Sequence, residues 1–139
     1  MREQEQLLRL AFAVGAVTDA LALLPMLCSP IARLLWGFDD PSGAYRFAFG
    51  YGASLMAGWT ALLIWAYRRP LDRRFVAALT VVVVYGLILT EAAAVVSGTI
   101  AAWRMIPTWV LQACLLSLFS SAYHYEALAN RWGHRPRLN

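Results

Sequence analysis

Four apolar runs constrain the fold of this chain more than any other feature of its sequence. They cover about residues 7–28, 44–67, 75–97 and 107–128. A helix that spans a bilayer needs about 20 consecutive, mainly apolar residues, whereas transmembrane β-strands are shorter and alternate in polarity. The runs therefore predict an all-α fold, an integral membrane four-helix bundle that forms a single transmembrane domain over residues 1–139.

Composition supports a membrane location and argues against a nucleic-acid partner. Only 14% of the residues are charged and 60% are hydrophobic, whereas soluble domains carry about 25% charged residues. The net charge is +4 and all twelve basic residues are arginines, most of them at the ends of apolar runs. That placement suits lipid head groups and topology signals, so we expect the lipid bilayer to be the partner of these arginines.

The distribution of arginines also predicts how the chain is oriented. If both termini share one side, that side holds nine arginines, and the other holds only Arg33, Arg46 and Arg104. Arginine and lysine are enriched in cytoplasmic loops. We therefore predict a multi-pass protein of a bacterial inner (plasma) membrane, with both termini in the cytoplasm. The connection 30–38 is amphipathic, which predicts a short helix lying in the membrane interface.

Two acidic residues interrupt the apolar runs, Asp19 in the first and Glu91 in the third. A charged side chain in hydrocarbon costs several kcal/mol, with estimates from about 2.5 upward, and it usually marks a functional site. The two residues lie at similar predicted depths, so we expect them to meet inside the bundle, in the half away from the termini. The alternative is a structural role, as a salt bridge or as a protonated carboxyl bonded to Thr18 or Thr90.

Other polar and aromatic residues fall near the same predicted depth. We expect Gln112, Trp59 and Tyr51 to surround a cavity that contains the two acids, and Arg46 or Arg104 to close it by pairing with a carboxylate. No metal-ligand set, nucleotide-binding loop or hydrolase motif is present, and no catalytic residue or cofactor is predicted. The two cysteines, Cys28 and Cys114, lie at different predicted depths, which argues against a disulfide; their redox state is left open.

Two further patterns concern packing. The segment Thr18-Asp19-Ala20 is echoed by Thr90-Glu91-Ala92, which suggests a parallel repeat of two helical hairpins; chance similarity between apolar helices is the alternative. Gly50, Ser54 and Gly58 form a ladder of small residues that favours close helix packing. Its partner is a helix of this chain, a second copy, or a larger membrane complex.

A family resemblance rests on the run from Gly50 to Thr60, GYGASLMAGWT, followed by Arg68-Arg69-Pro70. These residues resemble small prokaryotic four-helix membrane proteins. Over the whole chain, the size and layout are also similar to DoxX-like proteins and to the four-helix sterol-isomerase and sigma-2-receptor family. In the latter family, acidic residues inside the bundle bind a sterol or an amine, so the resemblance implies that part for Asp19 and Glu91. The chain does not match the family's remaining pocket residues.

Three functions are compatible with these patterns. The first is an intramembrane acidic pocket that binds a small hydrophobic or amphipathic molecule, with Asp19 and Glu91 holding a cationic or hydroxyl group. The second is a homodimeric transporter or channel for protons or cations that uses the same carboxylates. The third is an accessory subunit of a larger membrane complex. An enzyme acting on a lipid is left open.

Overall fold

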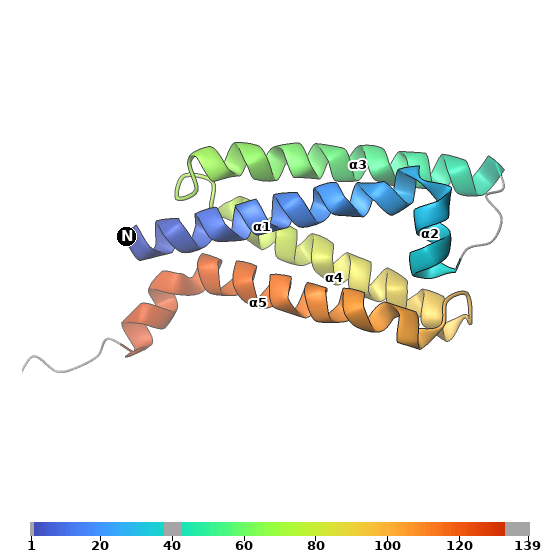
Figure 1. Ribbon diagram of the computed structural model, residues 1–139. Coiled ribbons are helices and arrows are strands. Elements are labelled where there is room, and N and C mark those ends of the chain that lie inside the picture. Colours follow the sequence, from blue (N-terminus) through green and yellow to red (C-terminus); the bar gives the residue numbers. More distant parts are fainter. Residues whose placement is uncertain (1, 38–42, 133–139) are drawn as a thin grey trace, which may run out of the picture.

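A computed structural model describes residues 2–37 and 43–132, with side chains through Tyr125. Within these residues every regular element is a helix (Figure 1). The helices are α1 (Arg2–Leu27), α2 (Ser29–Trp36), α3 (Gly43–Arg68), α4 (Phe75–Val96) and α5 (Ala102–Trp132). The four long helices α1, α3, α4 and α5 are long and apolar enough to cross a membrane. The all-α prediction is confirmed, and the structure supports a multi-pass helical membrane protein.

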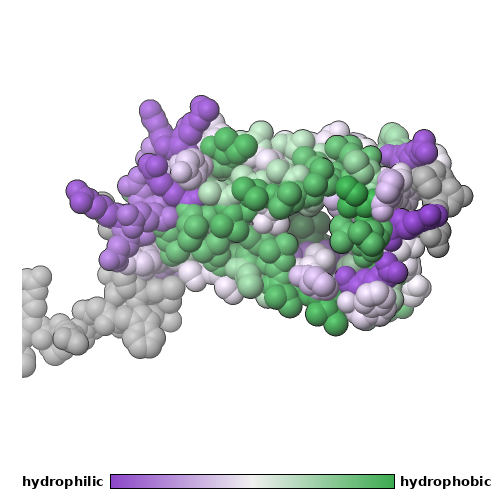
Figure 2. Space-filling view, in the orientation of Figure 1, coloured by the Kyte–Doolittle hydropathy of each residue, from purple (hydrophilic) through white to green (hydrophobic). Residues whose placement is uncertain are grey.

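The helices form two antiparallel pairs, with α2 lying across one end of the bundle (Figure 1). Helix α1 packs mainly against α3, and α4 packs mainly against α5, while α1 also contacts α5. Helix α2 contacts both α1 and α5. We call this end of the bundle the α2 end; the opposite terminal end carries Arg2 and the turn between α3 and α4. Hydrophilic residues gather at both ends and hydrophobic ones between them (Figure 2).

Local sequence accounts for the short helix and the tight turns. Pro30 lies in the first turn of α2, where its missing N–H is not needed. Gly37 ends α2 in the left-handed region with φ 78°, and its N–H donates to Arg33 O. Gly98, with φ 74°, follows α4 in the same conformation, which glycine adopts without steric cost. In the α3–α4 turn, the Arg73 guanidinium lies 3.4 Å from the centre of the Trp65 ring.

Helix bounds differ from the apolar runs where polar residues continue a helix. Helix α1 begins at Arg2 because Glu3 and Glu5 occupy its first turn, and acidic side chains there are stabilised by the helix dipole. The short helix predicted near residues 30–38 is α2. Helix α5 begins before Pro107, which lies inside the helix. Among the arginines used to predict orientation, Arg135 and Arg137 lie outside the described residues.

The apolar core fills the terminal half of the bundle. Phe12 and Phe119 are fully buried, with ring centroids 6.1 Å apart. Gly15 permits this close packing, because a Cβ atom there would lie 2.8 Å from Phe119 Cζ and 3.2 Å from Leu63 Cδ1. We call the cluster the apolar plug; its largest fully buried members are Leu8, Phe12, Leu63 and Phe119.

Candidate functional site

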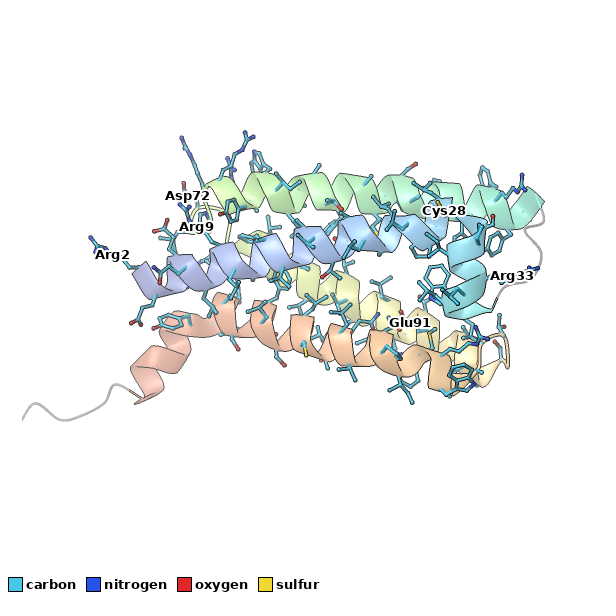
Figure 3. The ribbon with its side chains drawn as sticks, viewed as in Figure 1. Arg2, Arg9, Cys28, Arg33, Asp72 and Glu91 are labelled. Atoms are coloured by element: carbon cyan, nitrogen blue, oxygen red, sulfur yellow. The ribbon has the colours of Figure 1, made fainter. Side chains whose placement is uncertain are left out.

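The half of the bundle nearer α2 contains a hydrogen bond between two polar side chains of neighbouring helices. Gln112 Nε2 on α5 donates to Glu91 Oε1 on α4 at 2.9 Å. The Gln112 side chain is buried, with an exposed fraction of 5%. Glu91 is half-buried and lies in the α2-end half of the molecule (Figure 3). The structure therefore brings together two of the predicted site residues.

Two polar atoms around this hydrogen bond lack a partner. Glu91 Oε2 and Gln112 Oε1 are enclosed by protein, and neither has a well-formed hydrogen bond within the described part of the chain. The Trp109 indole N–H lies beside the same carboxylate and is directed at it as a weak hydrogen-bond donor. An unpaired buried polar group costs about 1–3 kcal/mol. Trp109 was not among the predicted site residues, although its i, i+3 spacing to Gln112 places the two on one helix face.

Trp59 adds an unpaired donor, from α3. Its side chain is half-buried and packs against the apolar plug. Its indole Nε1 is buried and has no hydrogen-bond partner within the described residues. Trp59 therefore packs its ring against the core and leaves its indole N–H without a hydrogen-bond partner.

Asp19 lies on the inward stripe of α1, just beyond the plug. It follows Gly15 by four residues, so it lies about 6 Å further toward the α2 end. Gln112 precedes Phe119, the neighbour of Gly15, by seven residues, or about 10 Å in the same direction. The two levels therefore differ by about one helical turn. Asp19 is half-buried, and no hydrogen bond joins it to Glu91 or to any other described residue.

We call Asp19, Trp59, Glu91, Trp109 and Gln112 the polar cluster because they lie at similar levels along the bundle; direct side-chain contacts join Glu91 to Gln112 and Trp109. All four long helices contribute to it. In Figure 2 the molecular surface is hollowed between α1 and α5, close to α2. The cluster therefore lies on the α2 side of the apolar plug, near this hollow.

The other predicted site residues lie elsewhere. Tyr51 is 65% exposed on the outside of α3, where it stacks on Phe47 with ring centroids 6.5 Å apart. Arg46 is exposed, without a hydrogen bond or ion pair to any described residue. Arg104 Nη1 donates to Leu34 O at 3.4 Å, which attaches the start of α5 to α2. Its guanidinium also lies 4.9 Å from the centre of the Trp103 ring.

The ladder of small residues on α3 faces away from the bundle. A Cβ atom added at Gly50 or Gly58 would meet no atom within 4 Å, and the Ser54 hydroxyl donates to Gly50 O of its own helix. A shallow groove of about 640 Å³ runs along the outer face of α5 and was not foreseen from the sequence. Its lining consists mainly of small and aliphatic residues: Leu7, Val110, Ala113, Cys114, Ser117, Leu118 and Ser121.

The described residues contain neither a disulfide nor a metal site. Cys28 and Cys114 are free and exposed. No group of three or more histidine, cysteine, aspartate or glutamate side chains is arranged to hold a metal ion among the described residues.

We compared the chain with protein-family models, with curated proteins and with solved structures. None of the three comparisons found a match.

Proposed function

We propose that this chain is a membrane protein that binds a small hydrophobic or amphipathic molecule in the α2-end half of its bundle. The observation that carries the proposal is a group of buried polar atoms without partners on the α2 side of the plug, Trp59 Nε1, Glu91 Oε2 and Gln112 Oε1; a further such atom, Gln4 Nε2, lies at the terminal end. In a membrane interior no bulk water satisfies such groups, and each costs several kcal/mol. A bound polar group that pairs with them removes this cost, which gives the site its affinity.

The shape of the molecule supports an amphipathic occupant. The polar cluster lies about one to two turns beyond the apolar plug. Figure 2 shows a hollow in the surface between α1 and α5, which we propose faces the acyl chains of the bilayer. A polar head placed at Glu91 and Gln112 leaves a hydrocarbon tail free to run through that hollow. Pockets of this kind, mainly apolar with a few polar groups that fix orientation, are typical of small-molecule sites.

Native mass spectrometry of the gently solubilised protein tests this proposal. We expect a non-covalent adduct on the wild-type chain and its loss in Glu91→Gln, since the amide presents one acceptor oxygen and an NH2 donor where the carboxylate presents two acceptor oxygens. Asp72→Asn is the matched control, because Asp72 is an exposed acid in the α3–α4 turn. An adduct that is equally abundant in wild type, Glu91→Gln and Asp72→Asn contradicts the proposal.

We also propose that the outward face of α3 mediates association with a second copy or a larger membrane protein. The open surroundings of Gly50 and Gly58 support this, since small residues let helices approach closely. Gly58→Leu should lower the associated fraction in mild detergent, measured by mass photometry, whereas Gly86→Leu on α4, which is equally open, should not. Equal behaviour of the two variants contradicts this role.

A further inference from the structure

Helix α2 leaves much of its apolar surface outside the bundle. Ala32 is buried against the neighbouring helices, whereas the side chains of Leu34 and Leu35 are 79% and 48% exposed. Leu34 lies about 160° around the helix from Ala32, so it faces away from the bundle. Contiguous exposed apolar residues of this kind mark a surface that contacts an apolar partner.

The charged residue of α2 lies opposite its apolar edge. Arg33 is exposed and projects from α2 away from the rest of the bundle (Figure 3). Ile31 and Leu35, two residues to either side of Arg33 in the sequence, each lie about 160° from it around the helix. A helix with one charged side and one apolar side is typical of segments that lie in the plane of a membrane interface.

The placement of α2 matches this interpretation. Helix α2 lies across the end of the bundle (Figure 1), so a bilayer around the four long helices runs parallel to the α2 axis. At the same end, Leu24 and Leu27 of α1 and Ile106 of α5 are exposed, as is Trp103, and tryptophan is enriched at membrane interfaces. The acyl chains that cover these apolar side chains therefore also reach α2.

The position of Arg33 argues against a water-soluble partner on the leucines. A protein that approaches the α2 end from water first meets Arg33, since this side chain projects away from the bundle. The edge formed by Ile31 and Leu35 lies on the opposite side of the helix. This arrangement favours a partner with hydrocarbon on one side and anionic groups on the other, which is the surface of a phospholipid leaflet.

We infer that α2 is a lipid-docking surface, in which Ile31, Leu34 and Leu35 insert among the acyl chains of the leaflet at the α2 end. Arg33 then lies at the level of the lipid phosphates, with which a guanidinium forms charge-assisted hydrogen bonds. This inference goes beyond the proposed function, because it concerns the outer surface of the molecule and needs no ligand inside the bundle.

Depth measurements by electron paramagnetic resonance test the inference on the full-length protein in phosphatidylcholine/phosphatidylglycerol liposomes. One nitroxide label is attached at Arg33→Cys, Leu34→Cys or Leu35→Cys, each in a Cys28→Ser/Cys114→Ser background. Power saturation compares collisions with oxygen, which concentrates in the bilayer, with collisions with a water-soluble nickel chelate. The ratio of the two gives the depth of each label.

Two reference positions calibrate the depth scale. Asp72→Cys, in the exposed α3–α4 turn, is the aqueous reference, and Val82→Cys, exposed on α4, is the bilayer reference. We expect the labels at Leu34 and Leu35 to lie about 5–10 Å below the head-group boundary, the depth to which interfacial helices bury their apolar faces. The label at Arg33 should lie at the head groups or outside them.

Three outcomes overturn the inference. Nickel collisions at Leu34 that equal or exceed those at Arg33 place the leucines in water, where a soluble partner is their occupant. Spin–spin broadening at Leu34 that disappears on dilution with unlabelled protein assigns the surface to a second copy of the chain. Nickel collisions at Val82 that equal those at Asp72 contradict the membrane location on which the inference depends.

Discussion

At the scale of single residues, the Glu91 carboxylate is held by an amide from a neighbouring helix rather than by a cation. Gln112 donates to one of its oxygens, and the one ion pair within the described residues, Arg9–Glu5, lies at the terminal end. An isolated buried charge is costly unless it is paired or hydrogen-bonded. The Gln112–Glu91 contact therefore contributes to stability as well as to the site.

Removing this donor should destabilise the protein more than removing the pair. Gln112→Leu should lower the free energy of unfolding by about 1–3 kcal/mol, because Glu91 loses its partner. The double variant Glu91→Leu/Gln112→Leu should recover most of that loss, since both partners become apolar. Unfolding in mixed micelles measures the three values. Single losses that simply add in the double variant contradict a direct contact.

The sequence located Glu91 and Gln112 but not the way in which they pair. A charged residue in an apolar run is visible without a structure, and the depths of Asp19 and Glu91 follow from counting residues. The rotation of each helix does not follow, because Ala-, Leu- and Val-rich helices offer several faces of equal hydrophobicity. For that reason Tyr51 was expected inside the cavity, whereas it lies on the outer face of α3.

At the scale of the helices, the packing of α1 against α3 and α5 depends on the absence of a side chain at Gly15. Leu63 and Phe119, from two different helices, occupy the space where a Cβ atom would lie. Both side chains are fully buried. In a tightly packed core they have little room to move away, so an added Cβ atom would displace neighbouring helices.

Comparing alanine substitutions at Gly15 and Gly86 should separate the effect of packing on the free energy of unfolding from the effect of helix propensity. Gly15→Ala should lower the free energy of unfolding by about 1–3 kcal/mol through overpacking. Gly86→Ala is the control: no atom lies within 4 Å of its added Cβ, so the change should be neutral or stabilise by up to about 1 kcal/mol. Micelle unfolding of both variants compares them. A milder effect at Gly15 than at Gly86 contradicts the packing described.

Besides its packing on α1, helix α2 also contacts the start of α5. Arg104 donates to Leu34 O near the end of α2, where the terminal carbonyls of a helix lack partners within the helix. Arg104→Ala should therefore speed amide hydrogen exchange across α2 and leave α4 unchanged. Arg46→Ala, at an exposed arginine without described contacts, serves as the control; equal exchange in α2 for both variants contradicts the attachment.

The sequence predicted which helices are present better than it predicted where each helix begins and ends. The four spans and the short helix were each predicted near their observed positions because apolar length and amphipathic spacing are local properties. The ends differ where polar residues extend a helix, as at Arg2 to Gln6, or where a proline is tolerated inside one, as at Pro107. A hydropathy pattern alone does not predict that polar residues extend a helix.

At the scale of the whole molecule, charge is distributed unequally between the two ends. The terminal end carries Arg2, Arg9 and the arginines of the α3–α4 turn, whereas the α2 end carries Arg33, Arg46 and Arg104. Figure 2 shows hydrophilic side chains projecting from the terminal end. By the positive-inside rule, we propose that the terminal end faces the cytoplasm.

The native cysteine at the α2 end offers a test of this orientation. Cys28 is exposed there, so a membrane-impermeant maleimide should label it in intact cells in a Cys114→Ser background. A cysteine introduced at Asp72, in the turn at the opposite end, should be labelled only after permeabilisation in a Cys28→Ser/Cys114→Ser background. The reverse pattern places the termini outside.

The apolar plug separates the polar cluster from the terminal end of the bundle. Fully buried rings and aliphatic chains of Leu8, Phe12, Leu63 and Phe119 close the terminal half, and moving a charge through such a low-dielectric layer costs several kcal/mol. On the proposed function, a molecule bound at Glu91 therefore enters and leaves on the α2 side of the plug.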